Sequence, residues 1–216
     1  PLNPNDIQIP NKITRFVDEN NLKYLHDAIL PRSLFLIESD FVEKNPTKVR
    51  PYVQGQNIDY KSEIKLLTND KAGKAGRAKW FVANRNVITQ NVKYIDEFQV
   101  VVSSANAGGQ KRDNQIEIVD NHSAFGRARV ALRSFKTYEE AHNFYMYATT
   151  YLIRYAFLMT DEALTSLGLL VPDIENYRAD NPVLDFSKNL DEQLFKIINL
   201  DDDEIKYIKN VINTLR

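Results

Sequence analysis

The chain has 216 residues, of which 43% are hydrophobic and 26% are charged, and its formal net charge is −1. This composition is typical of a globular protein with a sizeable core, organised as one large domain or as a domain with an appendage. Cysteine is absent, which excludes disulfides and cysteine-ligated metals and fits a cytoplasmic location. No apolar run reaches about 18 residues, so we expect no membrane-spanning helix.

The chain begins with Pro1-Leu2-Asn3-Pro4, without an initiator methionine and without a basic-then-apolar signal segment. Such a start is expected of a fragment of a longer protein. Catalytic groups that this sequence lacks are therefore expected in the rest of that protein.

The first part of the chain has helical periodicity that ends before Pro31. The apolar residues at three- and four-residue steps are Ile13, Phe16, Val17, Leu22, Leu25 and Ile29. The short apolar run Leu34–Ile37 then predicts a buried strand. Residues 45–59, which contain two prolines and a glycine, predict irregular structure.

Three segments in the middle of the chain predict β-strands. Residues 98–102 are rich in β-branched side chains, and residues 115–119 and 128–133 alternate polar with apolar side chains. In the third segment this alternation points Val130 and Leu132 to one face and the two arginines to the other.

Helices are predicted for the remainder of the chain. Thr137 and Glu140 form a capping-box signature ahead of an apolar stripe. Two further stripes lie within residues 190–198 and 205–215, and the acidic run 201–204 stands where negative charge meets the positive end of a helix dipole. The predicted class is α+β: a mixed β-sheet domain with helices, followed by a helical C-terminal tail.

Positive and negative charges are separated along the sequence. Between Lys71 and Lys136 there are 12 basic and 5 acidic residues, a net charge of +7, so the rest of the chain carries −8. A segment of this kind favours a polyanionic partner such as nucleic acid, although a merely uneven surface produces the same pattern.

The candidate DNA contacts come from two loops and a strand in this basic segment. The Gly/Lys-rich loop 71–77 and the polar loop 103–112 can present side chains without crowding. Arginine can bond phosphates or guanine edges, and short polar groups suit phosphate or adenine. The candidates are Lys71, Lys74, Arg77, Lys79, Arg85, Ser103, Ser104, Asn106, Gln110, Lys111, Arg112, Arg127, Arg129 and Arg133.

Trp80 and Phe81 lie between Lys79 and Arg85 in the sequence. This mixing of basic and aromatic residues occurs at nucleic-acid surfaces, where rings can stack on bases. The only tryptophan of a domain is also a common core residue, so both roles stay open for Trp80.

Catalytic signatures are missing from the sequence. It contains neither the Gly-x-x-x-x-Gly-Lys-Ser/Thr phosphate loop nor a Gly-x-Ser-x-Gly turn. His122 with two nearby acids is the one candidate metal cluster, in a segment that also suits an ordinary turn. Asp59 with Glu63–Lys65, and Asp201 with Glu204–Lys206, offer carboxylate–lysine sets of the kind that hold magnesium in nucleases. Such short sets are common by chance.

Several segments, taken in order, carry a resemblance to a known family. They are Val49-Arg50-Pro51-Tyr52-Val53-Gln54-Gly55-Gln56-Asn57-Ile58, Glu139–Phe144 followed by Tyr151–Phe157, Val171–Asp173, Leu190–Phe195 and Leu200–Ile208. In this order they resemble the C-terminal target-recognition regions of type II restriction–modification adenine methyltransferases and of fused restriction endonuclease–methyltransferases. The resemblance covers about residues 45–216.

The resemblance implies a role in recognition. In that family S-adenosylmethionine and the catalytic Asn/Asp-Pro-Pro-Tyr/Phe motif belong to a separate N-terminal domain, and this sequence has neither that motif nor a glycine-rich cofactor loop. The expected function is sequence-specific recognition of duplex DNA, without enzyme activity in this chain alone. The expected partners are duplex DNA and a catalytic methyltransferase domain of the same protein, which would hold S-adenosylmethionine.

This interpretation divides the chain into three parts. Residues 1–44 are expected to form a helix/strand segment that packs on the recognition domain, residues 45–160 the DNA target-recognition domain, and residues 161–216 the helical tail. Two other functions stay open. One is a magnesium-dependent nuclease that uses a carboxylate–lysine set, and the other is a protein-interaction or assembly domain that docks through the two C-terminal stripes.

Overall fold

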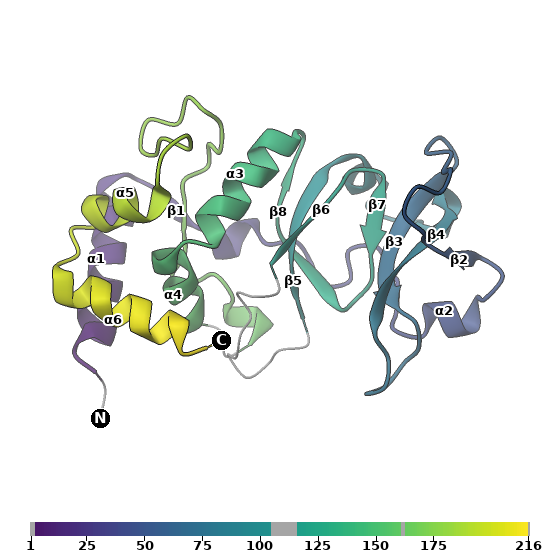
Figure 1. Cartoon of the computed structure of the whole chain (residues 1–216), viewed down its shortest axis with the longest axis horizontal. Helices are drawn as coiled ribbons and strands as arrows, with labels where there is room; N and C mark the ends of the chain where they lie inside the picture. Colours follow the sequence, from purple (N-terminus) through teal and green to yellow (C-terminus); the bar gives the residue numbers. More distant parts are fainter. Residues whose placement is uncertain (1–2, 105–115, 161–162, 216) are drawn as a thin grey trace. The chain divides into compact units, whose positions relative to one another are not determined.

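A computed structural model describes residues 3–104, 116–160 and 163–215 of the chain (Figure 1). These residues form six α-helices and three small β-sheets, which confirms the predicted α+β class. They divide into two compact units. Unit 1 comprises residues 3–29, 116, 139–160 and 163–215, and unit 2 comprises residues 30–104 and 117–138.

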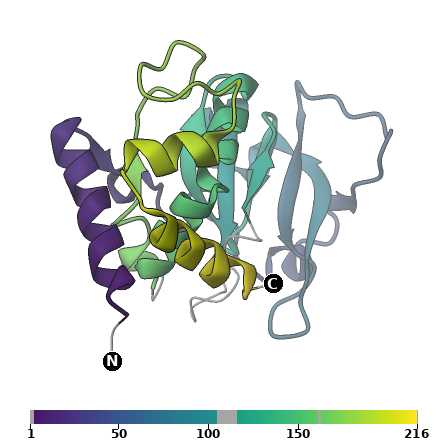
Figure 2. The same cartoon turned by 60° about the vertical axis from the view of Figure 1, so that its left-hand side comes forward.

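Unit 1 is mainly helical, and its last helix, α6, lies against its first helix, α1 (Figure 2). The two C-terminal helices confirm the end of the predicted helical tail, whereas residues 163–189 of that tail form a 3₁₀ turn, a short strand and loops. The helices are α1 (Asn5–Glu19), α3 (Tyr138–Ala148), α4 (Tyr151–Met159), α5 (Leu190–Ile197) and α6 (Asp202–Asn213). The 3₁₀ turns Leu25–Ala28 and Leu164–Ser166 and the antiparallel pair β1 (Lys23–Tyr24) and β9 (Pro172–Asp173) complete it.

Helix α6 begins at the acidic run, as predicted from the dipole argument. The Asp201 carboxylate accepts a hydrogen bond from the Glu204 amide at 2.8 Å, and the Glu204 carboxylate accepts one from the Asp201 amide at 3.0 Å. This reciprocal cap satisfies two amides at the start of the helix. Glu204 is only 1% exposed, and it also forms an ion pair with Lys12 of α1.

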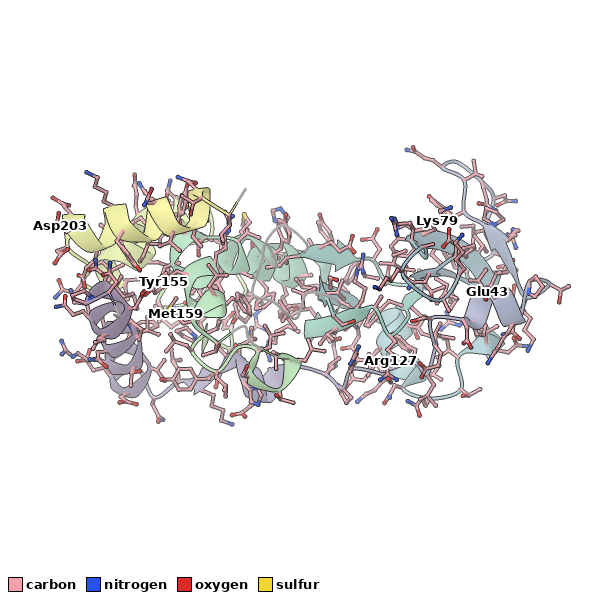
Figure 3. All side chains as sticks on the ribbon, turned by 90° about the horizontal axis from the view of Figure 1, so that it is seen from below. Glu43, Lys79, Arg127, Tyr155, Met159 and Asp203 are labelled. Atoms are coloured by element: carbon pink, nitrogen blue, oxygen red, sulfur yellow. The ribbon has the colours of Figure 1, made fainter. Side chains whose placement is uncertain are left out.

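A second polar contact joins the same helices. The hydroxyls of Tyr155 on α4 and Tyr207 on α6 donate hydrogen bonds to the two carboxylate oxygens of Asp6 on α1, at 2.6 and 2.8 Å. Figure 3 shows Tyr155 between α6 and α1. Burial of the hydroxyl, together with its hydrogen bond to Asp6, raises the pKa of Tyr207 to about 12. Asp6 therefore ties three helices together through protonated phenols.

Unit 2 is built from two sheets that share one core. Their strand orders are β2-β4-β3-β7 and β6-β5-β8, and all pairs are antiparallel except β3 with β7. Buried side chains from both sheets, such as Leu66, Phe81, Val101 and Ala131, form a single hydrophobic cluster. The strands are β2 (Val49–Pro51), β3 (Glu63–Asn69), β4 (Ala78–Asn84), β5 (Phe98–Ser103), β6 (Glu117–Val119), β7 (Ser123–Phe125) and β8 (Arg129–Phe135). The short helix α2 (Phe41–Lys44) and the 3₁₀ turns Arg85–Val87 and Val92–Asp96 connect them.

Two predictions for the N-terminal part of the chain are wrong. The first helix ends at Glu19, because Asn21 takes a left-handed conformation with φ of 52° and redirects the chain. The apolar run Leu34–Ile37 is a turn instead of a strand. Three of its side chains are buried, but Leu36 has φ of 55° and is 54% exposed.

The predictions for the middle strands agree better with the structure. The segment 98–102 is confirmed as β5 and the segment 128–133 as most of β8. The segment 115–119 corresponds to β6, which covers Glu117–Val119, and residue 115 lies outside the described residues. No helix in the described ranges is long and apolar enough to cross a membrane.

Candidate nucleic-acid interface

The parallel pairing of β3 with β7 brings two basic segments to one end of unit 2. Leu67 of β3 lies opposite Phe125 of β7, and the Gly126 amide donates to the Leu67 carbonyl at 2.8 Å. Residues 70–77 connect β3 to β4 and form a basic hairpin loop. This loop follows β3 and Arg127 follows β7, so both leave the sheet at the same end. We call this region the basic end. Its cationic residues are Lys71, Lys74, Arg77, Lys79, Arg127 and Arg129.

Asp70 closes the hairpin loop of the basic end. Its carboxylate accepts a hydrogen bond from the Arg77 amide at 2.9 Å and pairs with the Lys79 ammonium at 3.0 Å. The Arg77 guanidinium donates to loop carbonyls, including that of Lys74 at 3.0 Å. Lys71 and Lys74 are exposed and have no ion-pair partner within the described ranges. The hydrogen bonds of Asp70 and Arg77 therefore hold the loop backbone, and the loop presents the ammonium groups of Lys71 and Lys74 to solvent.

The second basic segment carries its arginines in ion pairs. Arg127 lies 3.4 Å from Glu38, and Arg129 lies 3.1 Å from Glu117. Lys79 and Arg127 lie on different sides of unit 2 when the chain is seen from below (Figure 3). The Arg127–Glu38 pair is exposed and such pairs are weak in water, so Arg127 can exchange its carboxylate for a phosphate at little cost, whereas Arg129 is partly buried.

The predicted serines are buried beside this segment. Ser103 and Ser104 are each 8% exposed. The Ser104 hydroxyl donates to the Arg127 carbonyl at 2.8 Å, and its amide donates to the Ala128 carbonyl at 2.9 Å. In this structure Ser104 holds the Arg127 segment in place. Four other candidates, Asn106, Gln110, Lys111 and Arg112, lie outside the described residues.

Arg85 and Arg133 lie apart from the basic end. Arg85 follows β4 at the opposite end of the sheet, where its guanidinium pairs with Asp96 at 3.0 Å. The Arg133 guanidinium lies over the Phe135 ring, 5.4 Å from its centroid. The structure thus places six of the predicted cations in segments at one end of the β3–β7 pair, on more than one side of unit 2, and leaves these two elsewhere.

The described residues of unit 2 are basic as a group. They contain 16 lysine and arginine residues and 10 aspartate and glutamate residues, a net charge of +6. Because the whole chain carries −1, the remaining residues carry −7. The separation of charge seen along the sequence therefore persists as a basic unit in the fold.

Trp80 has a partner that the sequence analysis missed. The ammonium of Lys65 on β3 lies 4.9 Å from the centroid of the Trp80 ring and 4.8 Å from that of Tyr52. Trp80 is half-buried and packs in part against the core, so it combines the two roles that the sequence left open. Tyr52 belongs to the segment 49–58, which carries part of the resemblance.

The two carboxylate–lysine sets are engaged in other contacts. Glu63 forms a bidentate pair with Arg50, which lowers the pKa of the Glu63 carboxyl. This pair lines a pocket of about 590 Å³ beside β2 and β4. Glu204 is buried against Lys12 and caps α6. Among the described residues, no group of three or more histidine and acidic side chains is arranged to hold a metal ion.

The two C-terminal stripes contribute to the core of unit 1. Leu190, Leu194, Ile208 and Ile212 are all buried, and only Ile197 of the first stripe reaches 36% exposure. Stripes that are already covered by their own chain do not favour an exposed docking surface.

Comparison of the chain with models of protein families, with curated proteins and with solved structures finds no match.

Proposed function

We propose that this chain recognises duplex DNA through the basic end of unit 2. The observation that carries the proposal is the parallel pairing of β3 with β7, which unites two basic segments that are distant in the sequence. Lys71 and Lys74 supply ammonium groups there, Arg127 supplies a guanidinium paired with Glu38, and Arg129 supplies one that contacts Glu117 and the Ala128 carbonyl. Such groups bond phosphates and base edges.

The resemblance extends this proposal to a biological setting. The chain then acts in the cytoplasm as the target-recognition part of an adenine-specific DNA methyltransferase of a restriction–modification system. A catalytic domain elsewhere in the same protein binds S-adenosylmethionine and transfers the methyl group, while this chain selects the DNA site. The chain on its own has no enzyme activity in this proposal.

The first test is a titration of the chain with random-sequence duplex DNA at several salt concentrations. Each phosphate contact contributes about −0.9 to the slope of log affinity against log salt. The variant Lys71→Ala/Lys74→Ala should therefore bind more weakly, with a slope shallower by up to about 1.8. The matched control Lys196→Ala/Lys206→Ala removes the same charge from exposed positions of unit 1 and should bind like the unaltered chain.

Two outcomes contradict the proposal. One is the absence of binding at about 50 mM salt, a condition that favours even non-specific contacts. The other is an equal loss of affinity in both double variants, which would mean that net charge, and not the basic end, governs binding.

A further inference from the structure

An aromatic cluster surrounds Lys65 on the partly exposed face of the sheet of β3 and β4. The Lys65 ammonium lies over the rings of Tyr52 and Trp80 at the distances given above. The Lys65 amide also donates to the carbonyl of His122 at 3.0 Å, so β7 begins beside it. Lys65 has no ion-pair partner among the described residues, and the two rings hold its charge in place of a carboxylate.

Tyr60 and His122 extend this cluster toward solvent. Their rings stack with centroids 5.0 Å apart and an angle of 27° between the planes. Tyr60 is 39% exposed. Burial, followed by the charges of Tyr52 and Asp120, raises the pKa of Tyr60. The stacked pair lies beside Lys65 because the His122 carbonyl accepts the hydrogen bond from the Lys65 amide. The cluster therefore comprises Tyr52, Tyr60, Trp80 and His122 around Lys65.

Neighbouring acids leave the Lys65 ammonium available. Glu63 is paired with Arg50, and Asp96 is paired with Arg85. The Asp59 carboxylate accepts hydrogen bonds from the Lys61 amide and the Ser62 hydroxyl, so it stabilises its own turn. An exposed ammonium, that of Lys61, stands directly after Tyr60 in the chain.

We propose that this aromatic cluster binds a single unstacked nucleotide of DNA. The base lies against the exposed ring of Tyr60 beside the half-buried rings of the cluster, and a phosphate or base carbonyl oxygen accepts hydrogen bonds from Lys65 or Lys61. Every base has an aromatic face, so stacking on rings is tolerant of sequence, and nearby cations balance the backbone charge. This inference rests on the proposed DNA-binding function and adds a second contact to the basic end.

The chemistry selects an unstacked nucleotide over a paired one. In an intact duplex each base face is covered by its neighbours. Trp80 is fixed in β4, and the Tyr52 amide donates to its carbonyl at 3.1 Å, so these rings cannot move into a stacked duplex. A base becomes available to them in a single strand or when it is extrahelical. Unit 2, with its net charge of +6, favours a nucleic acid over a neutral aromatic ligand.

The chain contains one tryptophan, Trp80, which reports directly on this cluster. We would follow its fluorescence while adding a single-stranded oligonucleotide, a fully paired duplex, and the same duplex with one extrahelical base. The single strand and the bulged duplex should quench Trp80. The bulged duplex should bind roughly tenfold more tightly than the paired duplex.

Two substitutions separate stacking from charge. Tyr60→Leu removes an exposed ring, and Lys65→Gln removes the central ammonium and keeps a polar side chain. Each should reduce the preference for the bulged duplex at least threefold. Tyr138→Leu removes another exposed tyrosine that lies outside the cluster, at 51% exposure, and should leave the preference unchanged. Circular dichroism of each variant shows whether it folds. If one of the two variants fails to fold, the other still tests the proposal.

The outcomes distinguish this inference from the proposed function. If both duplexes bind equally well in a salt-sensitive way and neither they nor the single strand quench Trp80, the inference is overturned and duplex binding stands. If the single strand quenches Trp80 while the paired duplex does not bind, the cluster is supported and the proposed function fails. Absence of quenching by any of the three ligands overturns the inference in every case.

Discussion

At the scale of single residues, the buried pair of Lys12 and Glu204 makes the sharpest stability prediction. Glu204 is 1% exposed, and the Lys12 side chain is 23% exposed. Replacing Lys12 with methionine leaves a buried carboxylate without its cation, since the Asp201 amide is then its one remaining donor among the described residues. We expect a loss of about 3 kcal/mol in the free energy of unfolding, measured by urea denaturation with an unchanged m-value.

Two companion variants identify the cause of that loss. Lys44→Met breaks an ion pair in which the lysine is 72% exposed, and it should cost much less stability than Lys12→Met. Adding Glu204→Gln to Lys12→Met removes the buried charge, so the double variant should recover part of the lost stability. Equal effects of the two lysine substitutions would show that burial of Glu204 is not the source of the cost.

At the scale of elements, the sequence predicted strands where polar and apolar residues alternate or β-branched residues gather, and it missed β3 and β4. In β3, Leu66, Leu67 and Thr68 are buried in succession, and in β4 three consecutive residues are buried as well. Both faces of these strands are covered over part of their length, so the period of two disappears. The sequence predicted the loop between β3 and β4. It did not predict that this loop closes a β-hairpin, because the two strands themselves were missed.

The same hairpin should respond to acid through Asp70. The hydrogen bond from the Arg77 amide, followed by the pair with Lys79, holds the pKa of Asp70 below its ordinary value of 3.8. Because the folded pKa is lowered, this contribution to stability is complete above pH 3.8 and is lost as the pH falls through the folded pKa. Hydrogen exchange of the Arg77 amide, followed from pH 5 to pH 2 and corrected for intrinsic rates, should show the loop opening in that range.

Asp70→Asn provides the control for this titration. Asparagine keeps an oxygen that can accept from the Arg77 amide, but it does not titrate. The acid-dependent opening of the loop should therefore disappear in this variant. An unchanged pH profile would mean that another carboxylate controls the loop.

At the scale of the whole molecule, the sequence contained the charged residues of the candidate interface but not their arrangement. The hairpin loop and Arg127 meet only because β3 pairs with β7 in parallel, a contact between distant parts of the sequence that local patterns do not reveal. The sequence offered Lys65 only as part of a carboxylate–lysine set, and its aromatic contacts were missed for a related reason. Its aromatic neighbours Tyr52 and Trp80 come from flanking segments, and the sheet brings them together around it.

This arrangement predicts how the chain behaves on a polyanionic resin. A chain with a net charge of −1 should pass through heparin at neutral pH if its charges were evenly spread. Because unit 2 carries +6, we expect retention and elution by salt.

Lys71→Ala/Lys74→Ala should elute at clearly lower salt. Lys196→Ala/Lys206→Ala has the same net charge and should elute like the unaltered chain. Identical elution of the two variants would place the binding surface outside the basic end, because only the position of the lost charges differs between them.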